Sequence, residues 1–277
     1  MVNTTTSSPF GLRAQPAPWR QWGTDLEAQA VQQMANACTL PIAVAGALMP
    51  DAHVGYGLPI GGVLATDNAV VPYAVGVDIA CRMRLSVFDW KANTIAGQKD
   101  RLTNIINRET RFGVGCVFRE RREHAVMDED WTVSLVTKRL RDKAWAQLGT
   151  SGSGNHFVEF GNFTVAADSL GIPPGEYLAL LTHSGSRGAG AQVCQHYSRL
   201  AMDRHPELPK ELKHLAWLSL DEEAGQEYWA AMNLMGHYAA ANHALIHHHI
   251  ARSLGEEAVL AIENHHNFAW KEVHRIA

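Results

Sequence analysis

The sequence has only four cysteines among 277 residues, and no two of them form a Cys-x-x-Cys pair. They stand far apart, at Cys38, Cys81, Cys116 and Cys194. In a chain of this length such spacing does not indicate a disulfide framework. We therefore expect free thiols and a reducing, cytoplasmic compartment.

The chain also lacks an excess of basic residues, a long apolar run and a secretion signal. Lys and Arg number 24 against 28 Asp and Glu, a formal net charge of −4. Proteins that hold nucleic acid by bulk charge are usually basic, so any such contact must be local. No apolar run reaches the roughly 18 residues of a membrane span. Residues 1–10 lack a basic segment followed by an apolar core, so secretion is not expected either.

Histidine, by contrast, is abundant, with 15 copies, several of them beside Gly, Ser and Asn. Histidine is the commonest metal ligand and an acid or base near neutral pH. Hydrophobic residues make up 46% of the chain and charged residues 19%, which is ordinary for a globular protein. The composition therefore favours metal chemistry in a globular fold.

Hydrophobic patterning predicts an α+β fold, a single mixed domain of β-sheets with flanking helices over residues 19–277. Residues 1–18, rich in Thr, Ser and Pro, are expected to be a flexible arm. Asp25 should cap the first helix, and Ser219 with Glu222 forms a capping box for the last. The predicted helices are 25–37, 99–108, 132–148 and 219–255; the predicted strands are 41–49, 62–66, 82–88, 157–160, 177–182 and 258–262; and 51–62 is predicted to be a glycine-rich loop.

Polar side chains recur where these strands meet glycine-rich loops, which is typical of functional sites on a rigid support. Asp78 and Cys81 stand three residues apart just before strand 82–88. A thiolate can bridge two metal ions, and a carboxylate favours harder ions such as Mn. The spacing fits equally well an aspartate that caps a turn and a small buried cysteine.

His156 lies at the junction of a loop and strand 157–160, between Asn155 and, three residues later, Glu159. A histidine in this position can ligate a metal. The alternative is that Asn155 stabilises a turn and His156 is a surface residue.

A third histidine, His183, ends strand 177–182 and precedes the loop 184–190, which is rich in Gly and Ser. The backbone N–H groups of such a loop suit phosphate, and Arg187 could bind it with two N–H groups. An ordinary tight turn is the alternative. The pair His265 and His266 adds another imidazole after strand 258–262.

His243 and His247 stand four residues apart in the last predicted helix and could form a zinc pair. Position 244 is alanine, however, so the glutamate of a His-Glu-x-x-His motif is absent. We expect these histidines to form a polar helix face with partly buried imidazoles.

Five motifs, in this order, resemble the RtcB family of tRNA-splicing and RNA-repair ligases. The resemblance runs from about residue 24 to about residue 272. The motifs are Met49–Gly62, Val75–Cys81, Gly154–Phe157, His183–Gly188 and His266–Asn267.

The resemblance implies an enzyme that joins RNA 3′-phosphate or 2′,3′-cyclic phosphate ends to 5′-hydroxyl ends, using GTP and two Mn ions. A histidine of the family is guanylylated, and GMP then moves to the RNA 3′-phosphate. RNA ends, such as tRNA halves, are the implied partners, together with an activating protein. By similarity the catalytic metal ligands are Asp78, Cys81, His156, His183 and His266, with Cys81 bridging.

The resemblance also implies residues that contact the nucleotide or assist at the site. Asp51 and His53 belong to a motif that lines the metal centre in the family. Asn155 and Glu159 match family positions that contact the nucleotide or assist at the site. Arg187 is expected to meet a phosphate.

The family continues well past residue 277, with glycine-rich segments that bind guanine and hold the guanylylated histidine. We expect the chain to lack that C-terminal part, because every glycine-rich histidine motif present is assigned to metal. Two alternatives to a ligase therefore stay open. One is a metal-dependent phosphoesterase, and the other is an inactive paralogue that binds RNA ends.

Overall fold

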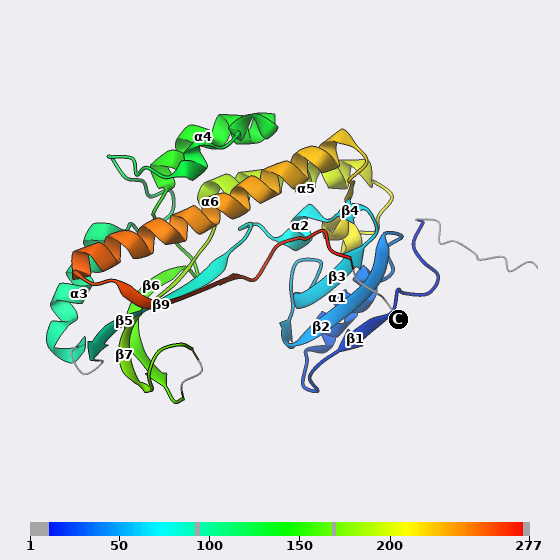
Figure 1. The fold of residues 1–277 in the computed structure, drawn as a ribbon. Coiled ribbons are helices and arrows are strands. Elements are labelled where there is room, and N and C mark those ends of the chain that lie inside the picture. The colour runs from blue at the N-terminus through cyan, green and yellow to red at the C-terminus, as the bar shows by residue number, and fades with distance from the viewer. Residues whose placement is uncertain (1–10, 92–94, 168–169, 274–277) are drawn as a thin grey trace, which may run out of the picture. The chain divides into compact units, whose positions relative to one another are not determined.

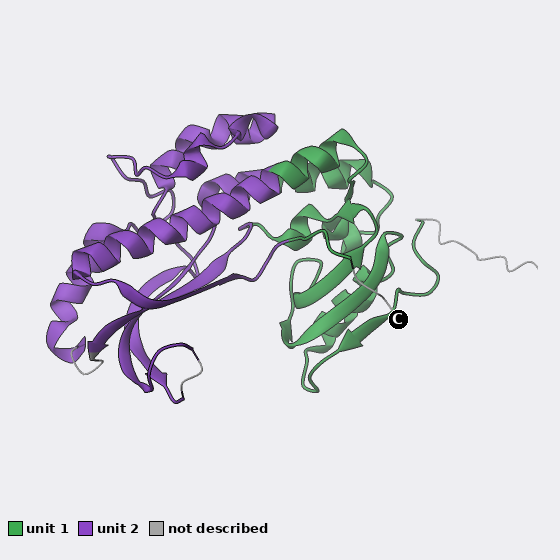
Figure 2. Cartoon of the chain, in the orientation of Figure 1, with its two compact units in different colours: residues 1–77, 194–230, 269–277 green, residues 78–193, 231–268 purple. Residues whose placement is uncertain are grey.

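The computed structural model describes residues 11–91, 95–167 and 170–273 (Figure 1). The chain divides into two compact units, each described here by itself (Figure 2). Unit 1 comprises residues 1–77, 194–230 and 269–277, and unit 2 comprises residues 78–193 and 231–268. Within the described residues helices accompany three β-sheets, so the predicted α+β class is confirmed.

Unit 1 is built on a three-stranded sheet of order β1-β2-β3. Strands β1 and β2 run parallel, whereas β2 and β3 run antiparallel. A second sheet pairs two short strands, β4 and β8. The elements of this unit are β1 (Trp19–Gln21), α1 (Ala28–Ala37), β2 (Ala43–His53), β3 (Ile60–Thr66), β4 (Ala69–Val70), α2 (Pro72–Val75), the 3-10 helix η4 (Lys210–Leu215) and β8 (Leu218–Ser219).

Unit 2 is built on a four-stranded antiparallel sheet of order β6-β7-β5-β9. Its elements are β5 (Arg82–Lys91), α3 (Ile95–Glu109), the 3-10 helices η2 (Ala125–Asp128) and η3 (Trp131–Val133), α4 (Leu135–Gln147), β6 (Phe157–Val165), β7 (Gly175–Ser184) and β9 (Ala258–His265). Two helices, α5 (Arg187–Arg204) and α6 (Glu223–Leu254), have residues in both units.

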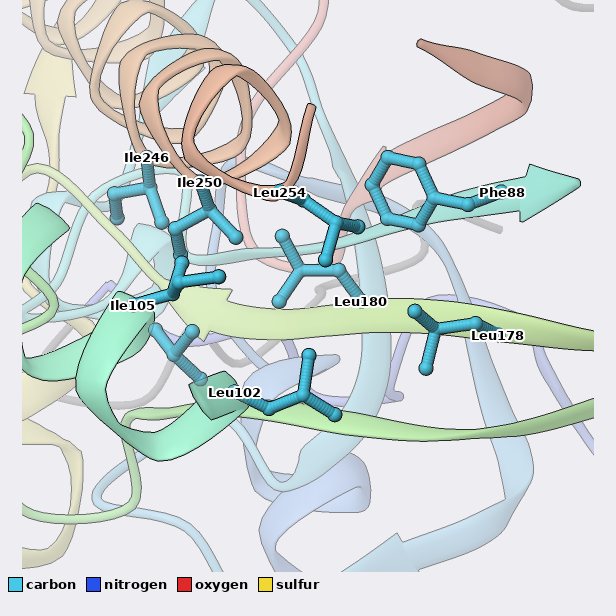
Figure 3. Packing of buried hydrophobic residues seen from close by; sticks show 9 residues of the cluster. Phe88, Leu102, Ile105, Leu178, Leu180, Ile246, Ile250 and Leu254 are labelled. Carbon is cyan, nitrogen blue, oxygen red and sulfur yellow. The ribbon is translucent and has the colours of Figure 1, made fainter. Parts of the chain in front are cut away.

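One face of the four-stranded sheet is buried under α3 and the C-terminal part of α6 (Figure 3). Leu180 of β7 and Phe88 of β5 pack against Ile246 and Ile250, which stand four residues apart on one side of α6. Each such buried side chain contributes roughly 1.5–3 kcal/mol through burial of apolar surface. This core fixes the sheet on which the candidate site is built.

The strand order brings four strand termini to one edge of this sheet. Because all neighbours are antiparallel, the starts of β5 and β6 lie beside the ends of β7 and β9. The register pairs Arg82 with Ser184 and with His265, and Phe157 with His183. The segments that carry the predicted metal ligands therefore meet at this edge.

Several sequence predictions differ in their boundaries. Helix α1 begins at Ala28 and has no side-chain cap, so Asp25 does not cap it. The segment predicted as loop 51–62 is partly strand, because β2 extends to His53 and β3 begins at Ile60. Ser219 lies in β8 and its hydroxyl accepts from the Asp221 N–H, so the predicted capping box is wrong.

At the N-terminal side, residues 1–10 of the predicted arm lie outside the described residues. Residues 11–18 contain no helix or strand, but they are tied to the end of α1. The N–H groups of Arg13 and Ala17 donate to the carbonyls of Thr39 and Cys38. Flexibility of the arm stays a prediction.

None of the helices described is both long and apolar enough to cross a membrane.

Candidate metal centre

The five predicted metal ligands all belong to unit 2, and the structure brings them together. Their donor atoms form two groups within which all atoms lie within 4.8 Å of one another. One group is Asp78, Cys81 and His156, and the other is Cys81, His183 and His266. Cys81 is common to both, which is the arrangement that a thiolate bridge between two ions requires.

Short contacts link the two groups through the Cys81 sulfur. The Sγ atom lies 3.4 Å from His156 Nε2 and 3.1 Å from His183 Nε2. His183 Nε2 lies 3.4 Å from His266 Nε2, and Asp78 Oδ2 lies 2.9 Å from His156 Nε2. Carboxylate, thiol and imidazole donors in one cluster suit a transition metal better than Ca²⁺ or Mg²⁺.

A tight turn places Asp78 and Cys81 on the same side. The Cys81 N–H donates to the Asp78 carbonyl at 3.1 Å, and Ala80 adopts a left-handed backbone with φ +58°. Asn267 braces the turn: its side-chain Nδ2 donates to the backbone carbonyl of Asp78 at 2.8 Å, and its backbone carbonyl accepts from the Ala80 N–H. This turn aims both side chains at one point.

The Asp78 carboxylate is oriented by the loop after β7. Its Oδ1 accepts the Ser186 N–H at 2.8 Å and the Ser186 hydroxyl at 3.2 Å. Burial alone would raise the pKa of Asp78, but hydrogen bonds from His156 and Ser186 and the nearby Arg187 charge outweigh it and lower the pKa. The carboxylate is thus ionised and its Oδ2 faces His156.

His183 is held in the tautomer that metal ligation needs. Its Nδ1 lies 3.0 Å from the backbone carbonyl oxygen of Asn155. This oxygen can only accept a hydrogen bond, so the ring proton resides on Nδ1. The lone pair of Nε2 then points to the Cys81 sulfur and to His266. A carbonyl that orients a ligating imidazole in this way is a common support in metal sites.

Burial shifts the pKa values of two other ligands of the cluster, Cys81 and His266. Burial, followed by the negative charge of Asp78, raises the pKa of the Cys81 thiol to about 12. Burial, followed by His183, lowers the pKa of His266 and keeps its imidazole neutral. Binding a metal must therefore expel the Cys81 proton, whereas His266 is ready to ligate.

His266, rather than His265, joins the cluster. The backbone N–H of His266 donates to the backbone carbonyl of Cys81 at 3.1 Å. This bond holds His266 beside the turn that carries Asp78 and Cys81. The His265 ring contacts Phe268 edge-on, with centroids 5.2 Å apart.

Arg187 reaches the cluster through His156. Its Nη1 lies 2.9 Å from His156 Nδ1, and its Nε is buried without a hydrogen-bond partner within the described residues. Gly152 leaves room for the guanidinium, because a Cβ there would lie 1.3 Å from Arg187 Nη2. An arginine with an unsatisfied N–H beside a metal cluster is suited to bind a phosphate.

The remaining predicted site residues belong to neither donor group. Asn155 contributes its carbonyl to His183, as described above, and its side chain is exposed. Glu159 lies exposed on β6, opposite Leu181. Asp51 and His53 lie in unit 1, where His53 Nδ1 is 3.0 Å from the Asp51 carbonyl. Their part in the site stays a prediction.

The second pair of histidines forms a buried polar network instead. His243 Nδ1 and His247 Nε2 lie 2.9 and 2.8 Å from the Thr182 hydroxyl, and His247 Nδ1 lies 2.7 Å from the Ser86 hydroxyl. Neither histidine belongs to a potential metal group in the described part of the chain. They are more deeply buried than a partly exposed helix face would make them.

Sequence reasoning missed Asn242, a fully buried residue of α6 that links the loop after α4 to the end of β7. Its Oδ1 accepts the Gly149 N–H at 2.7 Å, and its Nδ2 donates to the Thr150 carbonyl and to the Ser184 hydroxyl. Ser186, which orients Asp78, was also unassigned, although it lies inside a recognised motif. A mid-helix asparagine carries no comparable signal in the sequence.

Gly185→Ala tests the orientation of Asp78. An added Cβ would lie 2.4 Å from Asp78 Oδ1, so the carboxylate must rotate away from its bonds with Ser186. We expect Mn affinity to fall by about 10- to 100-fold, as when a supporting contact is lost, with the fold retained. Elemental analysis after equilibration with Mn measures this. Gly161→Ala on β6 is the control, because its added Cβ meets nothing within 4 Å, and equal Mn content in both variants would contradict the expectation.

The fold and this donor set define an α+β protein with a candidate dinuclear metal centre at a sheet edge. The family model "tRNA-splicing ligase RtcB" matches residues 33–138 and 120–277. The chain therefore belongs to the RtcB family.

Curated relatives support the same assignment. The chain is 34% identical over 273 residues to RNA-splicing ligase RtcB homolog 1 of Entamoeba dispar, covering 84% of this chain and 50% of the relative. It is 32% identical to the tRNA-splicing ligase RtcB of Archaeoglobus fulgidus, covering 91% and 62%. It is 30% identical to the RNA-splicing ligase RtcB of Mycobacterium tuberculosis, covering 88% of this chain and 67% of the relative. The chain thus spans about half to two thirds of the length of these relatives.

Proposed function

We propose that this chain forms the dinuclear Mn centre of a GTP-dependent RNA ligase that joins 3′-phosphate or 2′,3′-cyclic phosphate ends to 5′-hydroxyl ends. The observation that carries the proposal is the pair of donor groups that share the Cys81 sulfur. Membership of the RtcB family, whose relatives are named as RNA- or tRNA-splicing ligases, supports the same reaction.

The residues present fit two Mn ions. Asp78 and His156 would hold one ion, His183 and His266 the other, and the Cys81 thiolate would bridge them. Two bound ions supply Lewis acidity that stabilises charge on the entering and leaving oxygens of a phosphoryl transfer. The four cysteines are free, in keeping with the reducing compartment that a working thiolate needs.

The contact between Arg187 and His156 fixes which ring nitrogen of His156 carries the proton. The Arg187 N–H can only donate to an unprotonated His156 Nδ1, which leaves the ring proton on Nε2, facing Asp78. Ligation of a metal through Nε2 requires the proton on Nδ1 instead, and that N–H would repel the guanidinium. Arg187 would then turn away from His156, and its N–H groups would become available to a phosphate of GTP or RNA.

Asn155, Glu159, Asp51 and His53 complete the proposed nucleotide site by similarity to the family. The nucleotide-accepting histidine of the family has no counterpart that we can assign in this chain.

Labelled GTP tests the proposal. The Mn-loaded chain should bind α-³²P-labelled GTP in equilibrium dialysis, and binding should disappear when Mn is removed with EDTA, because bound cations neutralise the triphosphate. Absence of Mn-dependent GTP binding would contradict the proposal.

Three further measurements separate the possible activities: a denaturing gel of the α-labelled samples, phosphate release from γ-labelled GTP, and binding of RNA ends. Label retained on the protein would locate a nucleotide acceptor within these 277 residues. Binding without retained label supports a metal centre whose acceptor lies elsewhere. Release of phosphate from γ-labelled GTP without retained GMP would favour the phosphoesterase alternative, and RNA-end binding without any GTP binding would favour an inactive paralogue.

A further inference from the structure

An arginine-rich groove of about 930 Å³ opens in unit 2 between the end of α3, the segment after it and α6. Three glutamates also line the groove, together with two histidines of α6, His248 and His249. With five arginines against three glutamates the lining carries a formal charge of +2, whereas the chain carries −4. The arginines of this groove are Arg108, Arg111, Arg119, Arg121 and Arg122.

Aromatic rings hold several of these arginines in place. The guanidinium carbons of Arg122 and Arg111 lie 4.0 and 4.7 Å from the centroid of Phe118. That of Arg121 lies 4.9 Å from the centroid of Trp145. Cation–π contacts of this kind are favourable and orient the planar guanidinium. Aromatic contacts thus position three of the five arginines of the groove.

The positive charge is only partly compensated. Glu109 pairs with Arg108 and Arg122. Arg119 is exposed and makes no ion pair within the described residues, and the Arg121–Asp142 pair lies in solvent, at 43% and 81% side-chain exposure. Exposed pairs contribute little, so a polyanion can replace Asp142 as the partner of Arg121 at small cost.

The segment that carries the groove also contacts the loop before the metal ligand His156. The Ser151 N–H donates to the Arg111 carbonyl at 2.9 Å, and the Gly113 N–H donates to the Gly152 carbonyl at 2.8 Å. Phe112 and Gly152 form a parallel bridge. Gly152 in turn adjoins the Arg187 guanidinium beside His156. Groove and metal centre thus border the same short loop.

We propose that this groove binds the single-stranded RNA segment adjacent to the end that reacts at the metal centre. Arginines would hold successive phosphates without reading sequence. The ring of Phe112, next to Arg111 in sequence and 45% exposed, offers a stacking surface for a base just outside the groove lining, and Val117 in the lining, 48% exposed, offers an apolar contact. An acidic peptide supplies the charge but no bases to stack. The proposal rests on the proposed function, because that function supplies the RNA end.

Arg119→Glu in the 277-residue chain tests the groove. Binding of a fluorescein-labelled 12-nucleotide single-stranded RNA with a 3′-phosphate is followed by anisotropy in EDTA, which removes any contribution from bound metal. We expect affinity to fall by at least about fivefold, and the slope of log affinity against log salt to decrease by about one. Arg119→Lys should retain most of the affinity, because it keeps the charge.

Arg139→Glu is the matched control, with the same change of charge at an exposed position of α4 that does not line the groove. It should bind within about twofold of the parent chain, since salt screens distant charges over about 8–10 Å. Equal losses in both variants would overturn the proposal. So would competition by poly-glutamate as effective as that by unlabelled RNA of equal charge.

Failure of the proposed function gives a different pattern. RNA binding in EDTA that depends on Arg119 but is accompanied by no Mn-dependent GTP binding would leave the groove standing and remove the ligase. Mn-dependent GTP binding with RNA affinity insensitive to Arg119 would do the reverse.

Discussion

Cys81→Ala is expected to bind no Mn tightly, whereas the parent chain binds two ions. Cys81 is the one donor common to both groups of potential ligands among the described residues. Its removal leaves Asp78 and His156 for one ion and His183 and His266 for the other. Removal of a residue that only hydrogen-bonds to a metal ligand typically lowers metal affinity by about 10- to 100-fold. Because Cys81 is itself a ligand, we expect Mn affinity to fall by at least about 100-fold at both sites. Elemental analysis after Mn loading and desalting measures this.

Cys116→Ala is the matched control for this variant. Cys116 also lies in unit 2 and is free, but it belongs to neither donor group. Its sulfur contacts the Arg111 carbonyl. This control should retain two Mn ions. Unchanged metal content in Cys81→Ala would show that the site assignment is wrong, and loss of only one ion would remove the bridge from the account.

The second large effect is a loss of stability in mild acid. Burial lowers the pKa of His243 to about 3 and lowers that of His247 well below its usual range. In the unfolded chain both imidazoles should titrate near 6.5. The unfolded state therefore binds more protons as pH falls below about 6.5, and the stabilisation present above that pH is progressively lost. Between pH 7 and 5 protonation of His243 in the unfolded chain should lower the free energy of unfolding by about 2 kcal/mol, and His247 should lower it further.

Urea unfolding at the two pH values measures this loss, and His247→Ala apportions it. The variant should lose the part of the pH-dependent decrease that His247 contributes and keep the part due to His243. It should also be destabilised at pH 7, because it leaves a cavity and an unpaired Ser86 hydroxyl, and it removes one of the two histidine contacts of the Thr182 hydroxyl. His237→Ala, at an exposed position of α6 where Nδ1 lies 2.9 Å from Glu129 Oε2, is the control for removal of an imidazole outside the buried network and should retain more of the parent pH dependence than His247→Ala. An equal pH dependence in parent and His247→Ala would contradict the assignment.

Metal content separates the two histidine clusters. His247→Ala should still bind two Mn ions, because the His247 ring nitrogens face Ser86 and Thr182 and join no potential metal group in the described part of the chain. Loss of one ion in this variant would make the helix pair a metal site after all.

The strands that carry the candidate site were predictable because each combines an apolar run with a polar residue at its end. Strand 177–182 was expected to lead into His183, and β7 does so, ending at Ser184. Strand 82–88 was expected to follow Cys81, and β5 begins at Arg82. Alternation and apolar runs predict strands well, but they do not give strand order. The sheet order β6-β7-β5-β9, which joins the four ends, came only from the structure.

Helix α5 was missed because its first turn reads as loop. Gly188 and Gly190 follow Arg187, which itself has a left-handed φ of +56°. Glycine disfavours helices, so local propensity pointed to a turn. Gly190 is needed for packing, since a Cβ there would lie 1.8 Å from the Ser186 hydroxyl oxygen. Tertiary packing thus outweighs propensity at this helix.

Buried polar supports were the least predictable part of the site. Asn242 and the Thr182 hydroxyl act through partners far away in sequence, Gly149 and His243. No local pattern distinguishes such residues from ordinary polar positions, because their partners are set by the packing of α6 on the sheet. The metal ligands could be proposed because each stands in a motif at a strand boundary.

Electron paramagnetic resonance of the Mn-loaded chain, with Mn content determined on the same sample, tests the central claim most directly. Ions that share the Cys81 thiolate must be close enough for their spins to couple. The account predicts two Mn ions per chain and a spectrum of an exchange-coupled pair. A single Mn per chain, or two ions with the spectrum of isolated Mn, would contradict a dinuclear centre bridged by Cys81.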